Sequence, residues 1–226
     1  MIDNMKKTFR LIKYGHEVKG YLLLSMVFLL FGIFVKIMGI MPVGFDIIFL
    51  LMPPMFLCQI LYGLDYVKMV SSSALTRCIT VYMADLLVDV TVFVLLILYY
   101  VVTELRNNYP GEFLVAGFDE YYVPSTGYMM FFAGVMVFIL MCYMAGCYKC
   151  YWAATIIFCL LMMVYGGFSV FIMDYFQDKD ISNEAGFLAA VLFYLAGVLV
   201  SGGIRRLLYK VPVSSIAVGK RLGKLF

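Results

Sequence analysis

Six long apolar segments, separated by short polar connections, constrain this chain more than any other feature. They lie at about residues 20–35, 45–62, 78–102, 127–146, 151–173 and 186–204. A helix needs about 20 mainly apolar residues to cross the hydrocarbon core of a bilayer. Hydrophobic residues make up 65% of the chain and charged residues 14%, against about 25% charged residues in an ordinary soluble domain. The sequence therefore predicts an all-α integral membrane protein with six transmembrane helices in a single domain, residues 1–226.

Basic residues are divided unevenly between the two sides that six spans define. Only Lys36, Arg106 and Lys179 fall on one side, so the other side holds 14 of the 17 Lys and Arg residues. Short loops rich in Lys and Arg stay on the cytoplasmic side. We therefore expect a multi-pass protein of the cell membrane with both termini in the cytoplasm. Its basic face suits anionic lipid headgroups, and nothing indicates nucleic-acid binding.

The N-terminal segment, residues 5–18, has a helical apolar pattern. Phe9, Ile12 and His16 share one face, and lysine and arginine take most of the remaining arc. This pattern predicts an amphipathic helix in the cytoplasmic interface; the alternative is a basic flank that only sets orientation. A signal peptide is not expected, because no A-x-A-like site follows and five more spans do.

The connection between the second and third spans, residues 65–77, favours a short cytoplasmic helix. Three successive serines, residues 71–73, can cap a helix start, and Tyr66, Met69 and Val70 can form one apolar face. The alternative is a plain polar linker.

Two acidic residues of the third span, Asp85 and Asp89, are four positions apart and therefore share a helix face. An ionisable residue within a span is a functional candidate by default. If the span starts near Cys78, Asp89 lies about 16 Å deep and could bind a proton or a cation. If it starts near Leu86, both acids lie at the cytoplasmic rim. We favour the rim, because no buried basic partner is evident and Lys68 and Arg77 lie nearby.

Catalytic and metal-binding motifs are missing. His16 is the only histidine, which excludes zinc sites with two histidines. Cys147 and Cys150 form a C-x-x-C without a second pair, and we interpret them as packed or lipid-facing thiols. Residues 218–221 resemble a phosphate-binding loop but lack its first glycine, since position 214 is serine. We expect that this chain has no catalytic, metal-binding or cofactor-binding residues and that it is not an enzyme.

The second span contains Pro53-Pro54. Each proline lacks an N–H group and disfavours the preceding helical turn, so the sequence predicts a kink or a broken turn there. Within a membrane such a site is tolerated only against protein or water.

The order of these parts resembles the permease subunit of a type-2 ATP-binding-cassette (ABC) exporter. The shared order is a basic amphipathic helix, two spans, a short cytoplasmic helix and four further spans. In such families the segment after the second span often ends in a pattern like S-L-P-V-[ST]-R. Residues 72–77, SSALTR, are similar in their Ser, Thr and Arg but lack the proline, and Ala84 and Asp85 stand where a lysine often follows.

The resemblance includes small exporters of amphipathic peptides, such as phenol-soluble modulins, and lantibiotic immunity exporters. It implies a homodimeric permease working with a separate ABC ATPase, which binds ATP and Mg. It implies export of amphipathic peptides or other hydrophobic substrates. The ATPase-docking residues would be Tyr66, Met69, Val70, Ser72, Ser73, Leu75, Thr76 and Arg77.

Two other functions stay open. The first is an ion-coupled secondary carrier or channel using Asp85 and Asp89. The second is a structural or assembly membrane protein without transport. Only the permease needs the segment 65–77.

Overall fold

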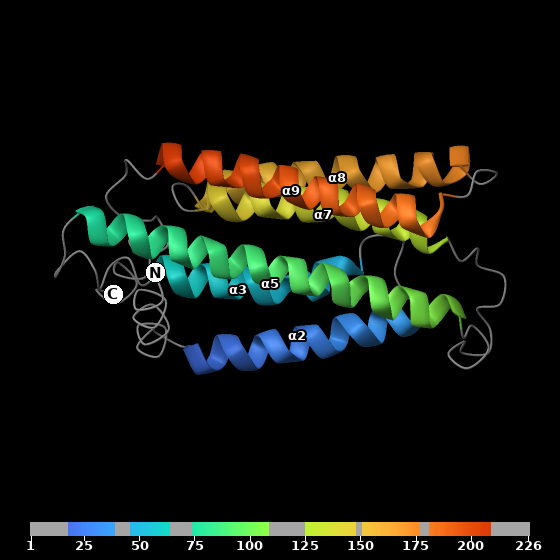
Figure 1. Cartoon of the computed structure of the whole chain (residues 1–226), viewed down its shortest axis with the longest axis horizontal. Coiled ribbons are helices and arrows are strands. Elements are labelled where there is room, and N and C mark those ends of the chain that lie inside the picture. The colour runs from blue at the N-terminus through green and yellow to red at the C-terminus, as the bar shows by residue number, and fades with distance from the viewer. Residues whose placement is uncertain are drawn as a thin grey trace.

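The computed structural model describes residues 18–38, 46–63, 74–108, 125–147, 151–176 and 181–208. Within these ranges the chain is all-α and forms six helices (Figure 1). They are α2 (Val18–Met38), α3 (Ile47–Gly63), α5 (Ala74–Asn108), α7 (Thr126–Gly146), α8 (Tyr151–Phe176) and α9 (Asn183–Leu208). Each predicted span falls on one helix. Residues 5–17 of the expected amphipathic helix lie outside the described residues.

Four segments of the described helices are long and apolar enough to cross a membrane. They are Val18–Met38, Asp85–Asn108, Thr126–Gly146 and Asn183–Leu207. The apolar stretches of α3 and α8, Ile47–Cys58 and Trp152–Phe168, are shorter. The expected class, a multi-pass membrane protein, is therefore supported by four spanning helices rather than by six.

Successive helices run in alternating directions along the bundle. Tyr21, early in α2, contacts Phe56, late in α3, with ring centroids 5.7 Å apart. Arg205, late in α9, pairs with Asp85, which lies in the N-terminal part of α5. We call the end where α2 begins and α9 ends the proximal end, and the opposite end the distal end (Figure 1).

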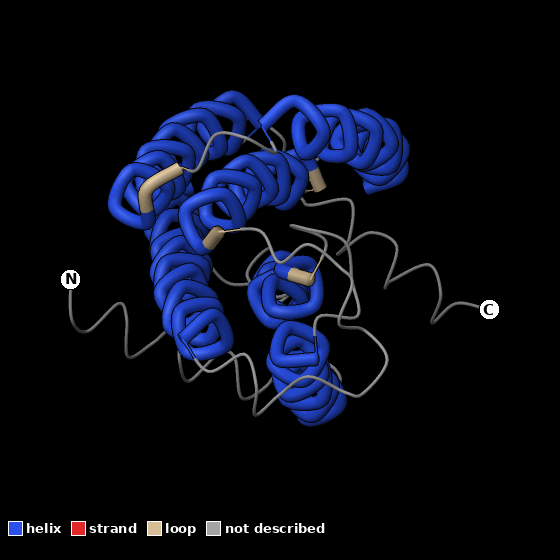
Figure 2. Tube along the Cα trace, turned by 90° about the vertical axis from the view of Figure 1, so that its right-hand side faces the viewer, coloured by secondary structure: helices blue, strands red, loops and turns tan. Residues whose placement is uncertain are grey.

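The helices form two groups of three. In the first half, α2, α3 and α5 pack against one another; in the second half, α7 packs against α8 and α9. Helix α7 also contacts α3 and α5, so it joins the halves near the centre of the bundle (Figure 2). Its buried side chains include Phe132, Met136 and Leu140, which belong to the same core as Leu96 of α5. We call the boundary between the halves the seam.

Small residues allow α7 and α9 to pack more extensively than any other helix pair. Gly127 lies against Gly186, and a Cβ atom added to Gly134 would lie 2.6 Å from the Cα of Ala190. Close approach through small side chains is the usual basis of helix association in membranes, where apolar burial alone gives no driving force between helices. The second half is therefore built around a tight α7–α9 pair.

The outer faces of the bundle are apolar. Helix α8 is covered mainly by α7, and its Trp152 and Met163 side chains are 75% and 74% exposed. Large exposed aliphatic residues also cover α2 and α9. A surface this apolar needs hydrocarbon around it, since soluble proteins rarely expose such continuous patches.

Helix α3 continues as one helix through Pro53 and Pro54. The broken turn that the sequence allowed is therefore absent from α3. Pro54 is buried and Pro53 is half-buried, which places the disturbed turn against protein, as a membrane setting requires.

Two helices extend beyond the predicted spans. Helix α2 continues to Met38, so Lys36 belongs to a helix and not to the expected distal loop. Helix α5 has 35 residues and begins at Ala74, so Leu75, Thr76 and Arg77 form its first turn rather than part of a separate short helix.

Candidate functional site

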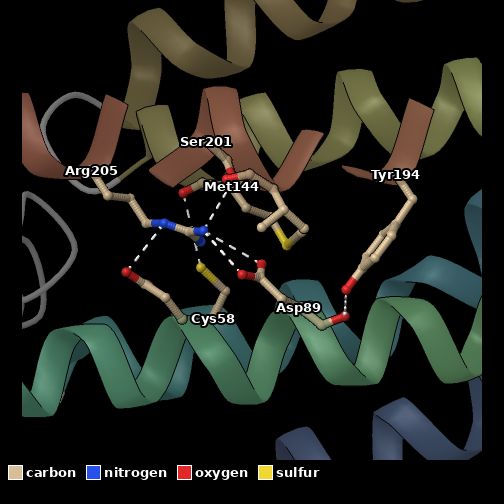
Figure 3. A network of polar contacts seen from close by, with 8 residues as sticks. Cys58, Asp89, Met144, Tyr194, Ser201 and Arg205 are labelled. Carbon is tan, nitrogen blue, oxygen red and sulfur yellow. Dashed lines mark hydrogen bonds and ion pairs between the residues drawn. The ribbon is translucent and has the colours of Figure 1, made fainter. Parts of the chain in front are cut away.

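A buried polar cluster joins α5 to α9 near the proximal end (Figure 3). Its members, which we call the proximal cluster, are Asp85, Asp89, Ser201 and Arg205. Each helix contributes two residues four positions apart, which a helix places on one face. Arg205 lies between the two carboxylates.

The guanidinium of Arg205 reaches all three partners. Its Nε atom lies 3.1 Å from Asp85 Oδ2, and its Nη2 atom lies 3.4 Å from both carboxylate oxygens of Asp89. The same Nη2 donates to Ser201 Oγ at 2.9 Å. Arg205 and Asp85 are each only 6% exposed. Removing one member of such a buried pair would leave an uncompensated charge, which is strongly unfavourable.

The sequence-based expectation that the two acids lack a buried basic partner is wrong. In the sequence, Arg205 directly follows the last predicted span, 186–204, and is therefore counted as a charge of the polar connection. In the structure it is buried and paired with Asp85 of α5. The i, i+4 spacing of Ser201 and Arg205 at the end of an apolar run could have signalled this face. Pairing of the acids with Lys68 or Arg77 stays a prediction, because Lys68 and the side chain of Arg77 lie outside the part of the chain that the structure describes.

Two further contacts cross the seam beside the proximal cluster. The Tyr194 hydroxyl of α9 donates to the Asp89 carbonyl of α5 at 3.1 Å. The Cys58 thiol of α3 donates to the Met144 carbonyl of α7 at 3.9 Å. Figure 3 places Cys58 beside the Arg205 guanidinium. Cys58 is 4% exposed, so its thiol is buried within the seam.

A second buried cluster, the distal cluster, consists of Lys36, Asp46, Tyr99 and Met129. Lys36 Nζ lies 2.8 Å from Asp46 Oδ2 and donates to the Tyr99 hydroxyl at 2.8 Å. Tyr99 in turn donates to Asp46 Oδ1 at 3.0 Å. The ammonium also lies 2.9 Å from Met129 Sδ and 4.2 Å from the centre of the Tyr99 ring.

The distal cluster corrects the expected position of Lys36. The charge count treats this lysine as one of three basic residues in the connections of the less basic side, whereas it is 1% exposed and pairs with buried Asp46. The cluster ties the end of α2 to the start of α3 and to α5. Sequence reasoning missed it because charge counting treats residues at segment ends as solvated.

Two hydrogen bonds donated by asparagine side chains join the halves at the distal rim. Asn107 of α5 donates to Thr126 of α7 at 2.8 Å. Asn183 of α9 donates to Glu104 of α5 at 2.8 Å, and this second bond is exposed. These contacts are weaker than a buried ion pair because they carry at most one charge and, in the second case, compete with solvent.

The thiol of Cys147, just beyond α7, is buried. Burial raises the pKa of this thiol to about 11, opposite to the lowered pKa of reactive cysteines. Its motif partner Cys150 lies outside the described residues. Among the residues that the structure describes, no three His, Cys, Asp or Glu side chains gather into a metal-binding group.

The expected docking segment is only partly described. Tyr66, Met69, Val70, Ser72 and Ser73 lie outside the described residues. Leu75, Thr76 and Arg77 belong to the first turn of α5 by their backbone. Their role as an ATPase-docking surface stays a prediction.

No protein-family model, curated protein or solved structure matches the chain. The similarity to an ABC permease therefore rests on the order of the helices alone, and any functional argument has to start from the geometry of the bundle.

Proposed function

We propose that this chain is the membrane-spanning permease subunit of an ATP-driven ABC exporter. It would work as a homodimer with a separate ATPase that binds ATP and Mg, and it would export amphipathic peptides or other hydrophobic substrates. All six helices would cross the membrane, with both termini in the cytoplasm.

The alternating directions of the helices support six spans. The described apolar stretches of helices α3 and α8 are shorter than those of the other four helices, but each helix packs alongside a spanning neighbour. Helix α3 is joined to α7 by Cys58 and Met144, and α8 by the Tyr165 hydroxyl, which donates to the Phe132 carbonyl at 3.2 Å. Helices packed this way along a spanning helix share its depth.

The length of α5 is the observation that carries the proposal. A helix of 35 residues is about 52 Å long, roughly 22 Å longer than a hydrocarbon core of about 30 Å. Both ends of α5, Ala74 and Asn108, would therefore lie outside the hydrocarbon core. At the proximal end, the helical turn that contains Leu75 and Arg77 would lie in the cytoplasm on a helix continuous with a span, which suits the transmission of ATPase motion.

The pairing of both acids with Arg205 also favours the permease over the carrier. Both carboxylates are already paired with a guanidinium at 3.1–3.4 Å, so a cation that bound there would have to displace Arg205. Asp85 and Asp89 would then act structurally.

Co-purification with the ATPase tests the proposal. The double substitution Met69→Asp, Val70→Asp should weaken recovery of the ATPase and ATP-driven export, because a short apolar face pressed into a groove does not accept buried charge. The matched control is the same pair of substitutions at lipid-facing Ile156 and Ile157, scored for membrane insertion alone. Unchanged recovery and coupling in the first variant would contradict the docking assignment.

The second candidate is the ion-coupled carrier, favoured by the burial of Asp85 and Asp89 inside the bundle. Proteoliposomes separate the two functions: one set contains the ATPase and ATP, and the other only an imposed ion gradient. The permease predicts transport only in the first set, and much of it retained in Asp89→Asn. Gradient-driven transport that Asp89→Asn abolishes would establish the carrier instead.

A further inference from the structure

We infer that the proximal cluster is an ion-pair gate, which holds the proximal end of the seam closed and opens when Arg205 leaves Asp85 and Asp89. This inference goes beyond the proposed function, since it concerns how the two halves move and applies to any transporter built on this bundle.

The first argument is the difference between the two ends of the seam. At the proximal end the ion pairs cross it, because Arg205 belongs to the second half and both acids to the first. At the distal end the ion pair of Lys36 and Asp46 lies within the first half. Separating the halves breaks two ion pairs proximally and none distally.

The second argument is the stiffness of the element that carries Arg205. Gly127, Gly134 and Gly186 bring α9 into backbone contact with α7. By contrast, α9 packs only lightly against α5. Helices α9 and α7 would therefore move together relative to α5 and α3, as in rigid-body rearrangements of packed elements, and the α5–α7 and α3–α7 contacts of the seam would open with the α5–α9 contact.

The third argument is the setting of the cluster. Asp89 is held through both its carboxylate and its carbonyl, by Arg205 and Tyr194 of the same helix. Ser201 fixes the guanidinium from the α9 side. The bonds to Asp85 and Asp89 all join one face of α5 to one face of α9, so they form and break together, as a two-state contact requires.

Cys58 offers a native reporter of opening. It lies on the seam between α3 and α7, beside Arg205, and is closed in this state. In a variant whose other cysteines are replaced, its alkylation by N-ethylmaleimide in lipid nanodiscs measures the open fraction, because a buried thiol reacts only when the seam opens.

The test compares Arg205→Gln with two controls. We expect Arg205→Gln to raise the Cys58 labelling rate about tenfold, which corresponds to about 1.4 kcal/mol in the opening equilibrium. Arg205→Lys keeps the positive charge, so its Cys58 labelling rate should lie between the rates of the parent protein and of Arg205→Gln. Arg206→Gln makes the same change at the neighbouring, exposed arginine and should leave the rate unchanged.

A second reporter separates gating from general loosening. In the same background without Cys58, a thiol introduced at Thr126, buried at the distal end, should keep its labelling rate in Arg205→Gln. A parallel rise at both ends would overturn the gate, since it would mean a bundle loosened throughout.

A milder variant covers the case in which Arg205→Gln does not fold. Ser201→Ala keeps every charge and removes the 2.9 Å bond to Arg205 together with the serine's own bond to the Val198 carbonyl within α9, so we expect a rise of about two- to threefold at Cys58. Labelling of Cys58 at the parent rate in Ser201→Ala and in every folded Arg205 variant would overturn the inference.

Discussion

Arg205 and Asp89 stand 116 positions apart in the chain, and the guanidinium of one lies 3.4 Å from both carboxylate oxygens of the other. This pair and its neighbour Asp85 tie the last helix to the middle of the bundle across the seam. The relationship gives the two intramembrane acids a basic partner inside the folded chain, where the sequence indicated none.

The topology of the bundle can be tested with introduced thiols at exposed, described positions. In a cysteine-free background, we expect Glu184→Cys, at the distal end, to react with a membrane-impermeant maleimide added outside intact cells. Arg206→Cys, at the proximal end, should react only after permeabilisation. The reverse pattern would place the termini outside and contradict the orientation inferred from the basic residues.

Breaking the distal cluster should destabilise the protein strongly. Lys36→Met leaves Asp46 buried without its cation, and we expect a loss of about 3–5 kcal/mol in the free energy of unfolding. The double variant Lys36→Met, Asp46→Leu should recover much of that loss, because no charge stays buried. Reversible unfolding in mixed micelles measures both.

The control for this series is Lys19→Met, which removes the same charge from an exposed position on the same helix. Its free energy of unfolding should stay within about 0.5 kcal/mol of the parent. An equal loss in Lys19→Met would show that the effect arises from net charge rather than from the buried pair.

A bulky side chain between α7 and α9 should separate them. A Cβ atom on Gly134 already meets the Ala190 backbone, whereas one on Gly202 has nothing within 4 Å. We therefore expect Gly134→Leu to cost about 1–3 kcal/mol through overpacking and Gly202→Leu to cost little. Thermal unfolding in detergent compares them; equal midpoints for both variants would contradict the close α7–α9 contact.

The Cys147 thiol should alkylate slowly and with a steep pH dependence. Its pKa is raised by burial to about 11, so at pH 8 only about one thiol in a thousand is ionised, and the thiolate is the nucleophile. In a variant that keeps only this cysteine, the iodoacetamide rate should rise about tenfold per pH unit between pH 8 and pH 10. A rate at pH 8 equal to that of a thiol at exposed Arg206 would instead indicate a reactive C-x-x-C cysteine.

The helices could be predicted from the sequence because their signal is local. An apolar run that forms a helix satisfies its own backbone hydrogen bonds, as a membrane setting requires, and Val18–Met38 and Thr126–Gly146 lie almost where the apolar runs predict them. The i, i+4 spacing of Asp85 and Asp89 likewise identified one polar face before any partner was known. Charge asymmetry gave the expected orientation, which depends on loops alone.

Only the tertiary structure decided what those charges contact. Lys36 and Arg205 each lie near the end of an apolar segment, where sequence alone cannot distinguish a solvated flank from a buried partner, because the difference depends on which helix packs alongside. Close packing of α7 against α9 through Gly134 and Ala190 sets the position of Arg205 over α5. Burial of a charge is a property of neighbours brought together from distant parts of the chain, and neither composition nor periodicity contains it.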